Sequence, residues 1–111
     1  RWPDAIADLK RVNDTKSADW NNLMGYAHRK LSPPDLAAAE RHYDAALAID
    51  AQHRGALEYS GELYLMKGDL ARAEQRLAQL ARACTACEEL EDLKQAVARF
   101  KANGNRYVAA N

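Results

Sequence analysis

Apolar and small residues recur every three to four positions along most of the chain, which is the period of an amphipathic helix. Turn-forming residues interrupt this pattern, above all Ser32-Pro33-Pro34 and Gly68, because proline lacks the helical N–H and glycine accepts the conformation that ends a helix. The pattern predicts an all-α protein with helices over these approximate ranges: 2–13, 18–31, 35–49, 54–67, 70–83 and 86–103.

Each predicted helix has one apolar stripe that needs a partner, since a helix this short is not stable alone. The stripe of the first helix ends at Val12, and the stripe of the second includes Leu23, so we expect both side chains to be buried. The last helix combines an apolar face with a charged one, which suits a helix that covers the end of a larger unit.

Composition supports this assignment. Apolar residues make up 48% of 111 residues, with five glycines, three prolines and many alanines, and alanine is the residue that favours helix most. Branched and aromatic residues are too few to build strands. The length suits one domain, which we predict over residues 1–104, followed by a flexible tail over 105–111.

The charge balance argues against nucleic acid as a partner. Lys and Arg number sixteen, as do Asp and Glu, and no basic cluster is present to displace phosphate counterions. No apolar run reaches the ~18 residues of a membrane span. The start at Arg1-Trp2-Pro3 is no signal peptide and, without an initiator Met, suggests a trimmed fragment or mature chain, so it leaves the compartment open.

An internal repeat is present at a fixed period. The hexapeptide Asp35–Glu40 recurs 34 positions later as Asp69–Glu74, with five of six residues identical. Ala5 stands a further 34 positions upstream of Ala39. Three helices therefore occupy equivalent places in a repeating unit.

The helices that precede them match as well, through small residues followed by larger ones at fixed spacing: Gly25, Ala39 and Tyr43, then Gly61, Tyr64, Ala73 and Leu77. With these residues the chain resembles the tetratricopeptide repeat (TPR) family over residues 18–85, and partly over 2–13. Gly25 and Ala39 are small, we expect, because the two helices of one hairpin cross closely there.

This resemblance implies a right-handed α-α superhelix. It would consist of a half-repeat helix (2–13), repeat one (18–51), repeat two (54–85) and a capping helix (86–103). The chain departs from the family pattern at His28, where a tyrosine is usual, and at Ala51, where a proline often stands. The Ser32-Pro33-Pro34 turn also lengthens the Gly25–Gly61 spacing to 36 residues.

Members of the family bind a peptide or helix of a partner protein along a concave face, which the first helix of each hairpin lines. The resemblance implies these partner-binding residues: Asn22, Tyr26, Arg29, Lys30, Glu58, Glu62 and Leu65. Glu58 and Glu62 would repel the C-terminal carboxylate that chaperone-binding members grip, so we expect a partner of mixed charge, its acidic part near Arg29 and Lys30. We predict a non-catalytic scaffold without cofactors.

Self-assembly is the main alternative, because the N-terminal end has no capping helix and Trp2 and Ile6 are candidates for an interface between copies. Nothing in the sequence predicts a catalytic site. There is no Ser-His-Asp order, no pair of buried carboxylates and no phosphate-binding glycine loop. His28 is expected to fill the tyrosine position, and His42 and His53 are expected at the surface.

Cys84 and Cys87 stand between the fifth and sixth predicted helices and admit three interpretations. The first is a structural disulfide or a pair of buried thiols, since cysteines at this spacing can meet the ~4.4–6.8 Å Cα separation of a disulfide. The second is thiol–disulfide chemistry, although the βαβ context of such sites is absent. The third is zinc, which needs two more ligands. A disulfide would favour a periplasmic or secreted protein, and free thiols a cytoplasmic one.

Overall fold

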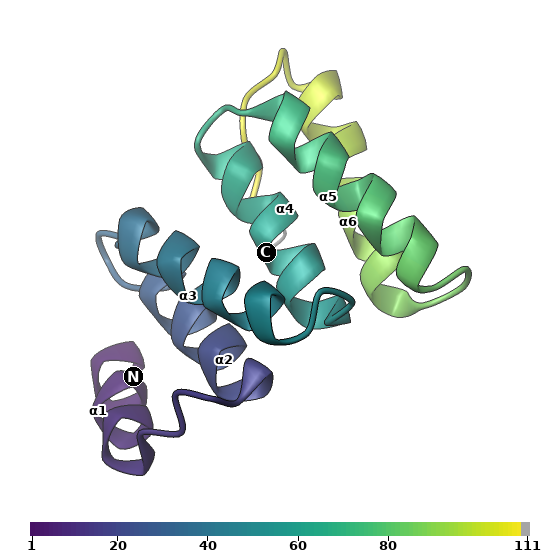
Figure 1. Cartoon of the computed structure of the whole chain (residues 1–111). Helices are drawn as coiled ribbons and strands as arrows, with labels where there is room; N and C mark the ends of the chain where they lie inside the picture. Colours follow the sequence, from purple (N-terminus) through teal and green to yellow (C-terminus); the bar gives the residue numbers. More distant parts are fainter. Residues whose placement is uncertain (110–111) are drawn as a thin grey trace.

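The computed structural model describes residues 1–109, which form six helices and no strand (Figure 1). The helices are α1 (Trp2–Val12), α2 (Ala18–Arg29), α3 (Leu36–Ile49), α4 (Arg54–Met66), α5 (Leu70–Ala83) and α6 (Glu88–Ala102). The all-α prediction is confirmed, and every predicted helix is present with its ends shifted by at most two residues. Within residues 1–109 no helix is long and apolar enough to cross a membrane.

Side chains at the starts of the helices explain where most of them begin. The Ser17 hydroxyl accepts the Trp20 backbone N–H at 3.1 Å and so caps the start of α2. Asp35 and Asp69, which are 34 positions apart, each accept a backbone N–H three residues on, both at 3.1 Å. The internal repeat therefore extends to the hydrogen bonds that start α3 and α5.

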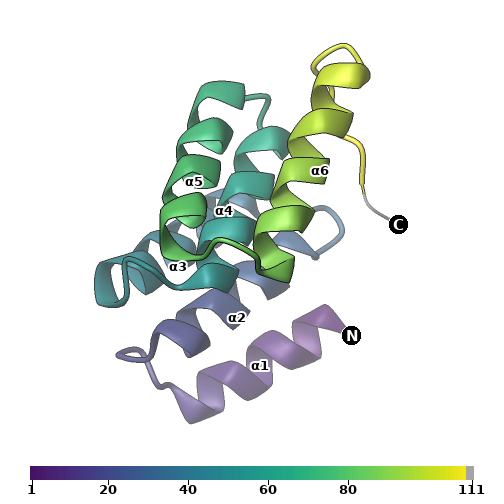
Figure 2. The ribbon, with the colours of Figure 1, turned by 90° about the vertical axis from the view of Figure 1, so that its right-hand side faces the viewer.

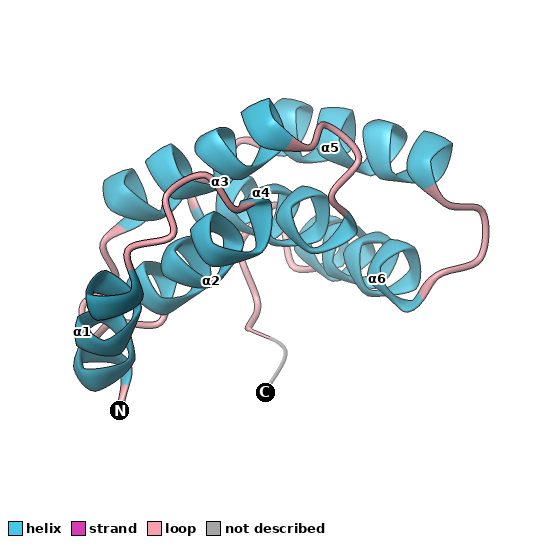
Figure 3. Ribbon diagram, turned by 60° about the horizontal axis from the view of Figure 1, so that its bottom comes forward, coloured by secondary structure: helices cyan, strands magenta, loops and turns pink. Residues whose placement is uncertain are grey.

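The helices form two layers (Figure 3). Helices α2 and α3 pack as one antiparallel hairpin and α4 and α5 as a second, and α4 also contacts both α2 and α6. Helices α2, α4 and α6 therefore line one side of the molecule, α3 and α5 lie along the other, and α1 covers α2 at one end. We refer to the side formed by α2, α4 and α6 as the concave side.

Two glycines permit the closest helix contacts. A Cβ atom added at Gly25 would lie 2.6 Å from Cε1 of Tyr43, so α2 and α3 approach one another as the sequence predicted. A Cβ atom added at Gly61 would lie 2.8 Å from both methyl groups of Leu93. The first glycine thus admits the partner helix of its own hairpin, and the second admits α6.

The larger core cluster joins α4, α5 and α6, and a smaller one joins α1 to α2 through Ile6, Trp20, Met24 and Ala27. Ile6 is buried there, whereas the other residue proposed for an exposed N-terminal end, Trp2, is 39% exposed.

Two apolar side chains that the sequence predicted to be buried are exposed. Leu23 is 54% exposed, because neither α1 nor α3 covers its face of α2. Val12 is 70% exposed, because it is the last residue of α1 and no helix lies over it.

The segment after α6 turns back at Gly104, whose φ of +68° is a conformation that glycine adopts readily. The chain then runs along the concave side (Figures 2 and 3). Tyr107 is half-buried and packs against the larger core cluster. The predicted flexible tail therefore includes a residue that packs on the domain, and its last two positions, 110–111, lie outside the described residues.

Candidate functional site

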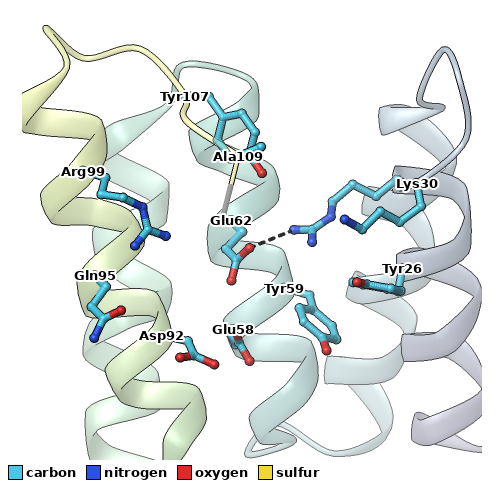
Figure 4. A pocket seen from close by; sticks show the side chains of 11 residues that line it. Tyr26, Lys30, Glu58, Tyr59, Glu62, Asp92, Gln95, Arg99, Tyr107 and Ala109 are labelled. Atoms are coloured by element: carbon cyan, nitrogen blue, oxygen red, sulfur yellow. Dashed lines mark hydrogen bonds and ion pairs between the residues drawn. The ribbon is translucent and has the colours of Figure 1, made fainter. Parts of the chain in front are cut away.

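A pocket of about 320 Å³ opens on the concave side, between α2, α4, α6 and the C-terminal segment (Figure 4). Its size is at the lower end of the ~300–1,000 Å³ range of ligand pockets, enough for a few side chains. We call it the concave pocket. Its lining residues are Tyr26, Arg29, Lys30, Glu58, Tyr59, Glu62, Asp92, Gln95, Arg99, Tyr107 and Ala109.

The aromatic end of this pocket consists of Tyr26 on α2 and Tyr59 on α4. Their ring centroids lie 4.7 Å apart, and the Arg29 guanidinium lies 5.2 and 5.5 Å from them. The Trp2 ring meets Tyr26 edge-on at 5.4 Å. Such distances are favourable for cation–π and edge-to-face contacts, so these side chains hold one another in place.

The Arg29 side chain is buried and makes its contacts within the chain. It is 6% exposed, and its Nη1 donates to Oε1 of Glu62 at 3.4 Å. We expected an acidic part of the partner near Arg29, but this guanidinium already has a carboxylate partner. Lys30 is exposed, with its ammonium group 5.5 Å from the Tyr26 ring, and it remains accessible from solvent.

The acidic end of the pocket consists of Glu58 on α4 and Asp92 on α6. Glu58 is only 7% exposed. Burial raises the pKa of its carboxyl group to about 9, and the nearby carboxyl groups of Glu62, Asp92 and Glu89 raise it further in the same direction. Glu58 is therefore protonated at neutral pH, although it points into a pocket that solvent can enter.

The C-terminal segment forms the remaining wall, through Tyr107 and Ala109. Burial raises the pKa of the Tyr107 hydroxyl, and the charges of Arg29, Glu62 and Arg99 act on it as well. A stretch of chain without helical structure therefore borders the concave pocket, with an aromatic side chain directed toward its interior (Figure 4).

Five of the seven residues that the TPR resemblance implied for partner binding line this pocket: Tyr26, Arg29, Lys30, Glu58 and Glu62. Leu65 does not, because it is 1% exposed and belongs to the larger core cluster. Asn22 also lies outside the pocket; it is 9% exposed, with its amide nitrogen 2.7 Å from where a Cβ atom on Gly55 would be.

Sequence reasoning missed Tyr59 and every lining residue after α4. Tyr59 follows Glu58 directly, and its ring lies in the pocket in tilted contact with the ring of Tyr26. The residues of α6 were missed because that helix was expected only to cap the array. One signal was available, since Asp92 stands 34 positions after Glu58, the period of the repeat.

Cys84 and Cys87 have their Cα atoms 6.0 Å apart and their sulfur atoms within bonding distance, which agrees with the first interpretation of this pair. Cys84 is 8% exposed and Cys87 is the N-cap residue of α6. Arg54 and Arg82 border a shallow depression beside them. Within residues 1–109, no group of three His, Cys, Asp or Glu side chains has an arrangement that could hold a metal ion.

The histidines have structural contacts. His53, expected at the surface, is the N-cap of α4: its Nδ1 accepts the Ala56 N–H at 3.0 Å and its Nε2 lies 2.6 Å from Oδ1 of Asp19. His42, also expected at the surface, is half-buried and stacks on His28 with ring centroids 5.4 Å apart. Burial lowers the pKa of His42, and the charge of His28 acts in the same direction.

Comparisons of this chain with models of known protein families, with curated proteins and with solved structures find no match.

Proposed function

We propose that this chain is a non-catalytic scaffold of the TPR type, which binds an extended segment of a partner protein in the concave pocket. The observation that carries the proposal is that a stretch of the chain itself without helical structure, including Tyr107 and Ala109, packs along this pocket and lines it. Contact with one such segment means that the walls suit polypeptide in shape and polarity.

The composition of the pocket supports the same function. Its aromatic end is a pair of tyrosines in ring contact, and aromatic side chains give large contact area at low entropic cost. Charged groups of both signs surround them, with Lys30 at one end and Asp92 at the other. A partner segment of mixed charge, as the sequence suggested, would find complementary groups at both ends.

The internal repeat and the two glycine contacts support a TPR superhelix in particular. Asp35 and Asp69 begin equivalent helices, and Gly25 and Gly61 stand at close helix contacts. Small-angle X-ray scattering of a chain extended by further copies of residues 18–85 would test the superhelix, because a stacked array lengthens regularly with each repeat.

A selection of random 16-residue peptides against the full chain tests peptide binding. Selected peptides should lose at least tenfold in affinity to Lys30→Glu and Asp92→Lys, which alter exposed charges in the pocket. Matched variants Lys94→Glu and Glu91→Lys change the same charges on the exposed surface of α6 outside the pocket and should bind as the wild type does. If both pocket variants bind every selected peptide unchanged, the site is wrong.

Self-assembly is a second candidate, because apolar side chains are exposed on α1: Trp2 by 39% and Val12 by 70%. In residues 1–109 this helix packs against α2 only, so its outer face is available to another copy. Light scattering during size-exclusion chromatography tests it. A monomer at high concentration would remove this candidate, and Val12→Ser should dissociate any oligomer that uses this face.

A further inference from the structure

The acidic end of the concave pocket has no positive charge of its own. Within residues 1–109, no Lys, Arg or His nitrogen lies within ion-pair distance of Glu58 or Asp92, whereas Glu62 is paired with Arg29. Glu58 is more than nine-tenths buried and is directed into the pocket (Figure 4). Buried carboxyl groups are normally paired with a cation. The carboxyl group of Glu58 instead shares a hydrogen bond with the carboxyl group of Glu62, so a ligand can supply the positive charge that this wall of the pocket lacks.

The neighbours of Glu58 define the charge that such a ligand must carry. On its own helix the nearest charged group is Glu62, and from α6 it faces Glu89 and Asp92. All three carry carboxyl groups. Of the arginines that line the pocket, Arg29 is paired with Glu62, and Arg99 on α6 forms no ion pair with Glu58 or Asp92 among residues 1–109. A cation placed between Glu58 and Asp92 would be attracted by Asp92 and would favour the ionised form of Glu58, whereas an anion would be repelled.

The shape of this end favours a side chain with a planar cation over a metal ion. No group of three ligands with metal-binding geometry exists among residues 1–109. Two carboxyl groups from adjacent helices suit a guanidinium, which presents several N–H donors in a fixed plane. The Tyr59 ring stands beside Glu58, and the chain already places the Arg29 guanidinium 5.5 Å from this ring.

We propose that the acidic end of the concave pocket, Glu58 and Asp92, binds an arginine side chain of the partner segment, with the stem of the arginine against Tyr59. This inference rests on the proposed function and specifies the partner: its bound segment contains an arginine whose guanidinium is held by two carboxylates. Lysine binds more weakly, because its ammonium group cannot donate to both carboxyl groups in one plane.

Binding of this arginine is linked to release of a proton. Free Glu58 is protonated at neutral pH, with a pKa of about 9, because of its burial and of the carboxyl groups of Glu62, Asp92 and Glu89. The guanidinium favours the ionised form, so its arrival expels the proton. The affinity for arginine therefore rises from pH 6 to pH 9, by up to about tenfold per pH unit when one proton is released.

A titration with two small probes tests this directly. N-acetyl-arginine amide and N-acetyl-citrulline amide have nearly the same shape, but only the first carries a charge. We expect the arginine probe to shift the backbone amide NMR signals of Glu58, Tyr59 and Asp92, and the citrulline probe to bind at least tenfold more weakly. Equal binding of the two probes, or shifts confined to other residues, overturns the inference.

Variants separate the acidic end from the rest of the surface. Glu58→Gln and Asp92→Asn should each weaken the arginine probe at least tenfold, and Glu58→Gln should remove the rise in affinity with pH. Glu91→Gln, on the exposed face of α6 outside the pocket, is the matched control and should change nothing. A pH dependence that persists unchanged in Glu58→Gln contradicts the assignment of the proton to Glu58.

The same probes distinguish failure of this inference from failure of the proposed function. If selected peptides bind the pocket without any preference for arginine, and the arginine probe shifts no NMR signals, the inference fails and the peptide-binding function stands. If the arginine probe binds at Glu58 and Asp92 but no peptide is selected, the cation site stands and the peptide-binding function fails.

Discussion

The two helical hairpins, α2–α3 and α4–α5, share a sequence pattern but use it differently. Gly25 and Gly61 occupy equivalent positions, yet Gly25 accommodates the Tyr43 ring within its own hairpin, whereas Gly61 accommodates Leu93 of α6. The reason lies in the partner helix, because the position of Tyr43 is occupied by the smaller Leu77 in the second hairpin. Both repeats therefore have a glycine at the position where another helix approaches closely. The side chain opposite that glycine decides which helix approaches it.

The pocket residues differ between the same two hairpins. Asn22 and Glu58 are equivalent on the 36-residue spacing of the glycines, as are Tyr26 and Glu62. Asn22 is neutral and lies outside the pocket, whereas Glu58 is a buried acid at its wall. The first hairpin thus contributes Tyr26 to the aromatic end, and the second contributes Glu58 to the acidic end, so the two ends of the pocket differ in part because the repeats differ.

The largest loss of stability from a single substitution is expected at one of the two glycines. Gly25→Ala should destabilise the protein by about 1–3 kcal/mol, because the added methyl group meets the fully buried Tyr43 ring. Gly61→Ala should cost about 0–1 kcal/mol, because its close contacts are with the end of the Leu93 side chain, the Cβ atom of Arg76 is at ordinary contact distance, and alanine gains helix propensity. Chemical denaturation measures both.

Tyr43→Leu is the matched second change for this comparison, because it gives the first hairpin the residue of the second. The double variant Gly25→Ala/Tyr43→Leu should be more stable than the sum of the two single effects allows, since the clash is gone. Purely additive effects would mean that the Tyr43 ring is not what Gly25 accommodates.

The second prediction concerns the pH dependence of stability that Glu58 causes and that the neutral Asn22 cannot cause. The pKa of Glu58 rises from its ordinary value of 4.5 to about 9 on folding, so between these values the folded protein holds more protons than the unfolded chain. The stabilisation by this proton is complete below about pH 4.5 and is lost as pH rises through about 9. The free energy of unfolding should fall by up to about 1.4 kcal/mol per pH unit.

Urea denaturation at pH 5, 6, 7, 8 and 9 measures this slope. Glu58→Gln should flatten it, because glutamine fills the same place without titrating. Glu88→Gln, an exposed glutamate in the first turn of α6, is the control and should keep the slope of the wild type. A Glu58→Gln variant with the full slope would show that another group binds the proton.

The smallest loss of stability is expected at the N-terminal ends of α4 and α6. His53 and Cys87 are N-cap residues 34 positions apart, but only His53 caps its helix with a side chain. His53→Ala should cost about 1 kcal/mol, as loss of an N-cap does. Cys84→Ser/Cys87→Ser should cost less, because the serine at position 87 gains a cap bond that offsets part of the lost link.

Thermal denaturation with and without a thiol reductant tests this pair. The reductant should lower the midpoint of the wild type slightly and leave the double serine variant unchanged. A large loss of stability in the double variant would mean that the Cys84–Cys87 link stabilises the start of α6 and that a serine cap at position 87 does not replace it. The same variant bears on thiol–disulfide chemistry, since it should retain peptide binding if the cysteines are structural.

The helices themselves were predictable because their causes are local. Apolar residues at a 3.6-residue period, the capping side chains of Ser17, Asp35 and Asp69, and the turn at Gly68 all act within a few residues. Their positions could be taken from the sequence with an error of one or two residues. The close contact at Gly25 was also predictable, because the repeat showed which two helices form a hairpin.

The site was predictable only in part. Five lining residues were found because they stand on the faces of α2 and α4 that the family resemblance marks. Leu65 was assigned to the same face, but α4 is covered by α5 and α6 at that position, so its side chain is in the core. Burial depends on neighbours distant in sequence, and a one-helix pattern does not contain them.

What the sequence determined by itself is the set of helices, their caps and the 34-residue repeat, because these depend on neighbouring residues. What only the tertiary structure decided is the pocket: the contact between the rings of Tyr26 and Tyr59 across two hairpins, and the return of Tyr107 to the concave side. The tertiary structure also brings the carboxyl group of Glu58 close to that of Asp92 on α6, and such charges interact through space. The raised pKa of Glu58 follows first from its burial and then from the neighbouring carboxyl groups of Glu62 and Asp92.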